Sequence, residues 1–246
     1  MTQRYFIQLS YDGSAFSGWQ IQPDVKSVQE TIELALTRLN SNVPVPVTGC
    51  GRTDAGVHAK NYIAHFDFQH LVNEQQFCYK LNKMLPADIT VHTLFPVSTN
   101  AHARFDATRR TYHYFIHQQK DPFLVKYSWH FPQQLNLEKM NEAAKSLLGK
   151  QDFTSFSKLH TDVKTNICEV YHASWTTLPN GQLRFEIQAN RFLRNMVRAV
   201  VGTLLEVGLE KEPATFVRKT IQEKDRNAAG VSVPAHGLFL TDIQYP

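Results

Sequence analysis

Hydrophobic residues in this chain either alternate in short runs or recur at helical spacing. From Tyr5 to Tyr11 every second residue is large and apolar or aromatic, which predicts a strand with one buried face. From Val28 to Leu39 apolar residues recur at helical spacing behind Ser27 and Glu30, which is typical of a capped helix that lays one face on a core. By the same criteria we expect strands at Val43–Val47, Tyr62–Phe68, Ile89–Phe95, Tyr112–Ile116, Thr165–Leu178, Gln182–Ala189 and Leu238–Ile243, and helices at Glu74–Leu85, Leu137–Leu148, Arg191–Val207 and Pro213–Glu223.

The two halves of the chain share one order of elements, a strand or hairpin followed by a helix and a further strand. Pro179-Asn180-Gly181 separates two strand patterns as a hairpin turn would. Asn73 and Asn136 stand where helix caps are expected, and Gly149 follows the end of one predicted helix. The pattern predicts an α+β fold with two lobes, residues 1–105 and 106–246, that meet in a cleft.

The composition indicates a folded protein that can bind nucleic acid. The 246 residues are 42% hydrophobic and carry a formal net charge of +4 with a pI near 8.9, which permits a nucleic-acid partner without requiring one. Three widely separated cysteines argue against a disulfide framework and a cysteine zinc site, and favour the cytoplasm. The N-terminus lacks a signal-peptide core, and no apolar run reaches the ~18 residues of a membrane span, so we expect no membrane association.

The stretch from Thr48 to Ala59, T-G-C-G-R-T-D-A-G-V-H-A, is the most distinctive of the chain. Three glycines surround Arg52, Thr53 and Asp54, and glycine lets a backbone bend tightly or lie against a ligand. Such a loop would hold one carboxylate and one guanidinium at a bend. A structural role stays open, because Asp often bonds its own backbone in turns. The spacing matches neither a phosphate-binding P-loop nor a nucleophile elbow.

Basic and aromatic residues are combined in the middle of the chain. Arg104, Arg109 and Arg110 precede Tyr112 and Tyr114, and strand alternation places both tyrosines on one face. Aromatic rings stack on unpaired bases and arginines contact phosphates, so this region suits RNA. An ordinary strand with two core tyrosines would give the same pattern.

Three arginines lie opposite the apolar stripe of the helix expected at Arg191–Val207, namely Arg191, Arg194 and Arg198. Such charges usually form a solvated basic face. The functional alternative is that one of these arginines turns inward and meets a carboxylate.

Taken together, these segments resemble the tRNA pseudouridine synthase A family. The family's signature is similar to the string G-R-T-D-A-G-V-H-A, and its other motifs resemble Y-D-G-S-A-F-S-G-W-Q, H-A-R-F, R-T-Y-H-Y, D-F-T-S-F, F-L-R-N-M-V-R-A-V-V-G and P-A-H-G-L-F-L, in the same order along nearly the whole chain. The resemblance implies the pseudouridine synthase fold, in which two α+β lobes with a largely antiparallel sheet form a central cleft. It also implies isomerisation of uridine to pseudouridine at nucleotides 38, 39 and 40 of the tRNA anticodon stem-loop.

Individual roles are implied at the positions that match. Asp54 matches the nucleophilic aspartate, and Arg198 matches the arginine that pairs with it. Tyr112 matches the tyrosine that packs on the target base, and Arg52 the loop arginine placed against the RNA. Two further arginines are expected to contact the RNA backbone, Arg104 and Arg110. The reaction requires no metal and no cofactor, and the family is dimeric, so the resemblance implies a cytoplasmic homodimer that binds tRNA.

Two other classes of protein account for parts of the sequence. A basic α+β protein that binds structured RNA without changing it would show the same charge and the same arginine–tyrosine strand, but it would not need Asp54. A metal-dependent hydrolase could use Asp54, His58, His65 and Asp67. Their spacing matches no common metal motif, and isolated histidines are usually structural.

Overall fold

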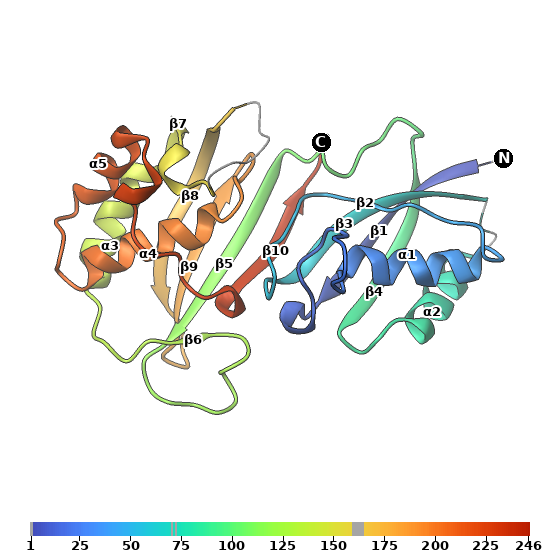
Figure 1. Ribbon diagram of the computed structural model, residues 1–246, viewed down its shortest axis with the longest axis horizontal. Coiled ribbons are helices and arrows are strands. Elements are labelled where there is room, and N and C mark those ends of the chain that lie inside the picture. Colours follow the sequence, from blue (N-terminus) through green and yellow to red (C-terminus); the bar gives the residue numbers. More distant parts are fainter. Residues whose placement is uncertain (1, 70, 72, 159–164) are drawn as a thin grey trace. The chain divides into compact units, whose positions relative to one another are not determined.

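A computed structural model describes residues 2–69, 71, 73–158 and 165–246, and the chain folds into two compact units (Figure 1). Unit 1 comprises Met1–Thr108 together with Leu240–Pro246, and unit 2 comprises Arg109–Phe239. Each unit combines helices with mostly antiparallel strands, which confirms the predicted α+β class. The last strand of the chain therefore returns to the unit formed by the first strands.

In unit 1, β1 pairs antiparallel with both β3 and β4, β2 pairs antiparallel with β3, and β10 lies next to β3. Helices α1 and α2 lie on one face of these strands (Figure 1). The strands are β1 (Thr2–Tyr11), β2 (Thr48–Gly49), β3 (His58–Gln69), β4 (Ile89–Val97) and the greater part of β10 (Leu238–Gln244), and the helices are α1 (Val28–Leu39) and α2 (Glu74–Met84).

Most elements predicted for unit 1 are confirmed, because their signals are local. Tyr5, Ile7 and Leu9 are fully buried on one face of β1. Ser27 caps α1 by accepting the N–H of Glu30 at 3.2 Å. The predicted Asn73 cap of α2 is also present.

The strand predicted at Val43–Val47 is wrong, since this segment has no regular secondary structure. Its two prolines have no N–H and cannot join a strand ladder. The N–H of Val47 donates instead to Oε1 of Glu33 on α1 at 2.9 Å. A helix side chain, not a neighbouring strand, thus holds the chain that leads into the glycine-rich loop.

In unit 2, the strand order is β5-β9-β8-β7 with antiparallel pairs, and β6 pairs parallel with β5. The three helices group together beside the strands (Figure 1). The predicted hairpin is confirmed, and Gly181 at its turn has a φ of +80°. The strands are β5 (Arg109–His117), β6 (Trp129–His130), β7 (Gly149–Asp152), β8 (Ile167–Thr177) and β9 (Leu183–Ala189), and the helices are α3 (Leu137–Ala144), α4 (Met196–Gly208) and α5 (Phe216–Glu223).

All three helices of unit 2 are shorter than predicted, and α5 begins at Phe216 rather than Pro213. The α3 helix ends at Ala144 and continues as a 3-10 turn, after which Gly149 begins a strand that the sequence did not predict. The α4 helix begins at Met196 rather than Arg191, because Asn195 adopts a left-handed conformation with a φ of +68°. Asn tolerates this conformation better than most residues. A helix that began at Arg191 could not continue through a residue in this conformation.

The late start of α4 overturns the predicted row of three arginines. Arg191 and Arg194 precede the helix, and only Arg198 lies on it. The guanidinium of Arg191 donates to the carbonyl of Thr165 at 3.1 Å. The three side chains therefore do not form one basic helix face.

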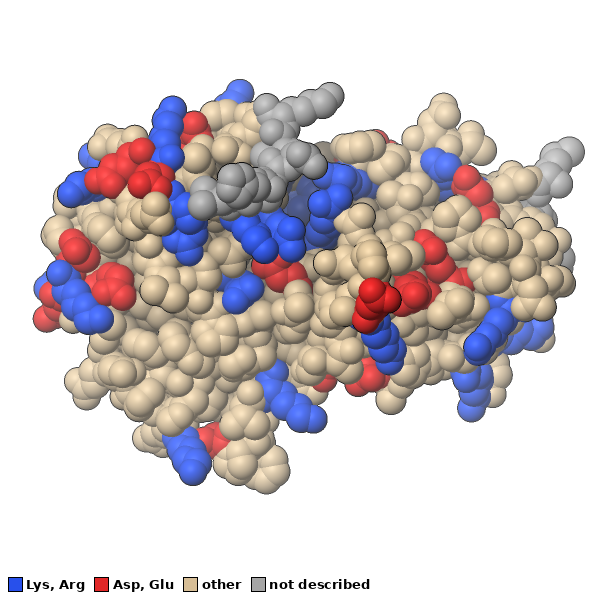
Figure 2. Space-filling view, in the orientation of Figure 1, with Lys and Arg blue, Asp and Glu red and all other residues tan. Residues whose placement is uncertain are grey.

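No helix in the described ranges is long and apolar enough to cross a membrane. The three cysteines, all within the described residues, form no disulfide. On the face shown in Figure 2, basic side chains are interspersed with acidic ones and with large uncharged areas, in keeping with the small net charge of +4.

Candidate functional site

Backbone pairing fixes both ends of the glycine-rich loop in unit 1, and its C-terminal end is fixed because Ala59 of β3 pairs with Tyr11 of β1. Thr48 of β2 pairs with His65 of β3, and the N–H of Cys50 donates to the carbonyl of Ile63 at 2.9 Å. The hydroxyl of Tyr62, also on β3, donates to the carbonyl of Gly51. The loop is thus held against the strand that follows it.

Asp54 lies at a tight turn in the middle of this loop. The N–H of Val57 donates to the carbonyl of Asp54 at 3.1 Å, and Gly56 has a φ of +76°, a conformation that favours glycine. The preceding Thr53 is buried, and its Oγ1 lies 2.9 Å from the hydroxyl oxygen of Tyr11. The Asp54 side chain is half-buried on a backbone that is fixed on both sides.

A second loop, residues 13–19, packs against the first one. Gly18 has a φ of +90°, and a Cβ there would lie 2.3 Å from the carbonyl oxygen of Thr53. The N–H of Trp19 donates to the same oxygen at 3.3 Å. The N–H of Gly13 donates to Nδ1 of His58 at 3.1 Å. The Y-D-G-S-A-F-S-G-W-Q segment therefore supports the loop that carries Asp54.

Trp19 fills the space beneath the glycine-rich loop. Its ring stacks on Tyr62 at 4.0 Å and it is 3% exposed. A Cβ at Gly49 would lie 2.5 Å from this ring, so the sequence needs glycine there for the close approach. Trp19 therefore supports the glycine-rich loop by packing beneath it.

A shallow pocket of about 180 Å³ opens beside the loop in unit 1. The exposed side chains of Arg52 and Arg104 both line it, and no carboxylate does. Asp54 is not part of the lining. The full lining consists of Trp19, Gln20, Gln29, Val47, Thr48, Gly49, Gly51, Arg52 and Arg104.

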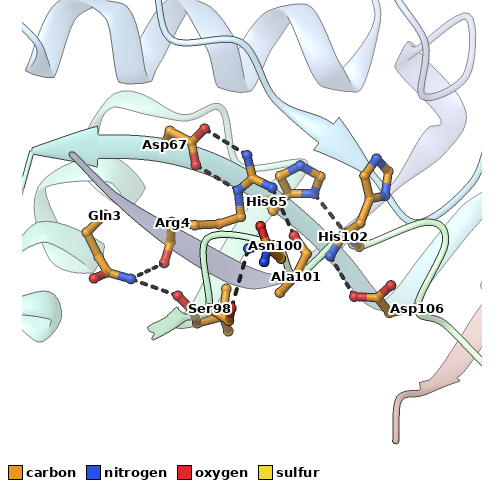
Figure 3. A network of polar contacts seen from close by, with 11 residues as sticks. Gln3, Arg4, His65, Asp67, Ser98, Asn100, Ala101, His102 and Asp106 are labelled. Atoms are coloured by element: carbon orange, nitrogen blue, oxygen red, sulfur yellow. Dashed lines mark hydrogen bonds and ion pairs between the residues drawn. The ribbon is translucent and has the colours of Figure 1, made fainter.

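Arg104 belongs to the H-A-R-F segment, which a polar network ties to the strands of unit 1 (Figure 3). Arg4 of β1 forms two hydrogen bonds with Asp67 of β3, at 2.7 and 2.8 Å, and donates a third to the carbonyl of Ala101 at 3.0 Å. His65 accepts the N–H of Ala103 on Nδ1 at 3.1 Å. The backbone on the N-terminal side of Arg104 is therefore fixed at two points.

The protonation state of His65 matters for this network, because only an unprotonated Nδ1 can accept a hydrogen bond. Burial lowers the pKa of His65 to about 4, and the positive charge of Arg4 acts in the same direction. His102 stabilises the turn formed by residues 102–105, since its Nδ1 accepts the N–H groups of Arg104 and Phe105 at 3.1 and 3.2 Å.

Three of the four residues of the hydrolase alternative have structural partners. His58 is bonded to the Gly13 backbone, His65 to the Ala103 backbone and Asp67 to Arg4. Among the described residues there is no group of three or more His, Cys, Asp or Glu side chains placed to hold a metal ion.

Tyr112 and Arg110 lie on β5 in unit 2. Tyr112 is 9% exposed, and its ring meets Phe192 edge to face with centroids 5.1 Å apart. Arg110 donates to the carbonyl of Asn190 at 2.8 Å. Both side chains thus contact the segment that leads from β9 to α4.

Arg198 lies in the first turn of α4, against the segment that precedes β10. Its Nε donates to the carbonyl of Val233 at 2.7 Å, and the N–H of Val233 donates to the carbonyl of Arg198 at 3.2 Å. The hydroxyl of Tyr114 donates to Pro234 at 2.9 Å. Burial raises the pKa of Tyr114 while nearby Arg198 opposes this rise, so the phenol stays protonated beside the guanidinium.

The predicted site residues divide between the units. Unit 1 carries Asp54 and Arg52 on one loop and Arg104 on another, and the two arginines share a pocket. Unit 2 carries the other three, Tyr112, Arg110 and Arg198. The sequence did not predict the supporting roles of Thr53, Tyr62 and Val233, because they arise from contacts between distant segments.

The chain is similar to known proteins along nearly its whole length. The family model described as "tRNA pseudouridine synthase" matches residues 8–106 and 143–246, a range that includes Asp54 and Arg198 but not Tyr112. Curated proteins named tRNA pseudouridine synthase A are similar: that of Parabacteroides distasonis is 54% identical, with 99% of this chain and 96% of the relative covered. The protein of Bacteroides thetaiotaomicron is 51% identical, with 99% and 91% covered, and that of Bacillus subtilis 41% identical, with 96% and 97% covered.

Proposed function

Because this chain belongs to the tRNA pseudouridine synthase family, and so to a family of isomerases that act on tRNA uridines, we propose that it modifies the uridines at positions 38, 39 and 40 of the anticodon stem-loop with Asp54 as nucleophile. The observation that carries this proposal is the turn of the glycine-rich loop. At this turn the Asp54 carboxylate is half-buried, and the residues around it resemble the family's signature. The backbone of the loop is fixed at both ends.

The reaction breaks the N1–C1′ bond of uridine, turns the base and joins C5 to C1′. The C5 proton is lost and N1 regains one, so the conversion is redox-neutral and consumes no co-reactant. One ionised carboxylate suffices in the proposal, either by attacking the sugar or the base or by stabilising or deprotonating an intermediate. Neither a metal nor a cofactor is part of this chemistry.

In the proposal, Arg198 supplies the positive charge that keeps the Asp54 carboxylate ionised. Val233 accepts from its Nε, so the two Nη groups are the donors that would meet the carboxylate as a fork. This pairing is supported by the resemblance, and both residues lie within the ranges that the family model matches.

The target uridine has to leave the helical stem, at a cost of a few kcal/mol. Stacking on an aromatic ring recovers ~1–3 kcal/mol per base, and Tyr112 is the proposed platform, with Phe192 packed against its ring. The two energies are comparable, so further contacts to the RNA backbone must supply the rest. Arg52, Arg104 and Arg110 are the proposed donors.

The resemblance further supports a cytoplasmic homodimer, and sedimentation with and without tRNA tests that stoichiometry.

We predict that Asp54→Asn lowers kcat by at least ~10³-fold, the scale of loss when a nucleophile is removed. The measurement is tritium release from tRNA labelled at C5 of uridine, because forming the new bond expels the C5 hydrogen. The tRNA affinity of the variant should stay within a small factor of wild type, since Asn keeps the size of the side chain.

Asp24→Asn is the matched control, because Asp24 is exposed and outside the glycine-rich loop. It should release tritium at the wild-type rate. Substantial tritium release by Asp54→Asn would rule out the proposed nucleophile. Mapping of pseudouridine by mass spectrometry in tRNA from cells lacking the protein tests the positions, and uridine should then persist at 38, 39 and 40.

A further inference from the structure

We propose that the exposed ring of Phe105 in unit 1 is a stacking platform for an unpaired base of the RNA other than the target base. The inference rests on the proposed function for its ligand, and it adds a second base position to the one proposed for Tyr112. Phe105 is 74% exposed, so its ring contributes little to the core. An exposed aromatic ring offers the flat apolar face on which a nucleobase stacks.

The turn formed by residues 102–105 holds this ring on a fixed backbone. The N–H groups of Arg104 and Phe105 both donate to Nδ1 of His102. The N–H of His102 donates in turn to the carboxylate of Asp106 at 2.7 Å, and the N–H of Asp106 donates to the carbonyl of His102 at 3.1 Å (Figure 3). A platform that is fixed in advance loses less conformational entropy when its ligand binds.

The Phe105 side chain is the exposed end of a row of four rings. Its centroid lies 4.2 Å from that of His102, with an interplanar angle of 31°. His102 meets His65 edge to face at 4.7 Å, and His65 stacks on the buried Phe6 at 6.3 Å. Single exposed hydrophobic residues are common on protein surfaces, but Phe105 is positioned by the rings behind it.

The row lies on the face of the unit 1 sheet that α2 does not cover. Phe68 of β3 packs on Phe77 of α2 with centroids 5.1 Å apart. Successive strand residues point to opposite faces, so His65, three residues before Phe68, points away from α2. The ring of Phe105 is therefore presented on the open face of the sheet.

Arg104 indicates which kind of partner covers the ring. Its guanidinium carbon lies 5.7 Å from the Phe105 ring centroid, and its side chain lines the pocket beside the glycine-rich loop. Burial of this charge under an apolar protein surface would be costly, whereas guanidinium groups accompany aromatic rings where bases stack. A base on Phe105 would belong to a nucleotide that passes close to the glycine-rich loop.

The test replaces the unpaired nucleotides of an anticodon stem-loop RNA by abasic nucleotides, one at a time and leaving the target uridine intact. Dissociation constants are measured for wild type, for Phe105→Ala, Phe105→Leu and Phe105→Trp, and for the control Tyr79→Ala. Tyr79 is a matched control because it is 63% exposed and has Nζ of Lys83 5.4 Å from its ring centroid, but it lies on α2.

One abasic position should weaken wild-type binding about tenfold, the scale of one base stacked on an aromatic ring. Phe105→Ala should lose about as much affinity for intact RNA and lose nothing further on that abasic RNA. Phe105→Leu should behave like Phe105→Ala, because it is apolar but has no ring. Phe105→Trp should keep the wild-type affinity and the sensitivity to the abasic position, and Tyr79→Ala should match wild type on both RNAs.

Three results would overturn the platform: losses that add in Phe105→Ala, wild-type affinity of Phe105→Ala, or wild-type affinity of Phe105→Leu. A changed oligomeric state of Phe105→Ala in sedimentation, without coupling to any base, would also overturn it, because the ring would then pack on a second copy of the chain. Tritium release by wild type on intact RNA separates this test from the proposed function. Normal release without coupling rejects only the platform, and coupling without release rejects only the isomerase assignment.

Discussion

The titration of His65 links one side chain to the stability of unit 1. Burial, reinforced by Arg4 and His102, lowers its pKa from 6.5 to about 4. Between these values the unfolded chain binds a proton that the folded chain does not, so acid favours unfolding. We predict that the free energy of unfolding falls as the pH drops from about 6.5 to about 4. His65 should account for at most ~1.4 kcal/mol of this fall per pH unit. Below a pH of about 4, the contribution of His65 to the free energy of unfolding should be constant. Urea unfolding over this range measures the slope.

Burial also lowers the pKa of His117 and of His236, so a variant must isolate the part due to His65. His65→Asn keeps an oxygen that can accept the N–H of Ala103 but removes the titrating ring. Its pH slope should be smaller than that of wild type. Identical slopes in His65→Asn and wild type would show that His65 is not the group responsible.

Elements whose signals are local could be predicted from sequence, and elements that depend on distant partners could not. The caps of α1 and α2 follow from Ser27 and Asn73, which bond to backbone groups three residues away. The start of α4 depends on the left-handed Asn195, which apolar spacing does not reveal. The Val43–Val47 segment has strand-like side chains, but its backbone is satisfied by a helix.

The candidate site follows the same rule. Asp54, Arg52 and their glycines form a local string, so composition and resemblance were enough to single them out. The contacts that fix this loop come from Tyr11, Trp19 and Tyr62, and no local sequence pattern predicts these contacts. The pocket shared by Arg52 and Arg104 likewise exists only because the H-A-R-F segment folds back onto β1 and β3.

The contact between α1 and the segment before the glycine-rich loop can be tested directly. Glu33 accepts the N–H of the buried Val47 at 2.9 Å. We predict that Glu33→Ala lowers the free energy of unfolding by ~1–3 kcal/mol, because it leaves a buried donor unpaired. Chemical denaturation measures the change. Glu33→Gln keeps an acceptor at the same place and should recover most of the loss; equal losses in both variants would mean that the hydrogen bond is not the cause.

At the scale of the whole chain, the last residues complete the first unit. Residues 240–246 belong to unit 1, where Tyr245 packs on Phe6 at 5.3 Å and bonds to Ala103. All of unit 2 therefore lies between the two segments that form unit 1, and the segment that carries Arg104 is held by Tyr245. We predict that Tyr245→Ala destabilises unit 1 by ~2–4 kcal/mol, the range for losing a large packed side chain.

Hydrogen exchange resolves this effect by unit. In Tyr245→Ala the amides of β3 and of the segment around Ala103 should lose protection, whereas those of the β8–β9 hairpin in unit 2 should keep it. Tyr245→Phe retains the ring contact with Phe6 and removes only the hydroxyl donor, so its loss should be about 1 kcal/mol and centred on Ala103. A uniform loss of protection across both units would contradict the assignment of residues 240–246 to unit 1. A selective loss of amide protection in unit 1 should be accompanied by a lower RNA affinity if Arg104 acts as proposed. The reason is that the backbone of Arg104 would no longer be fixed before the RNA binds.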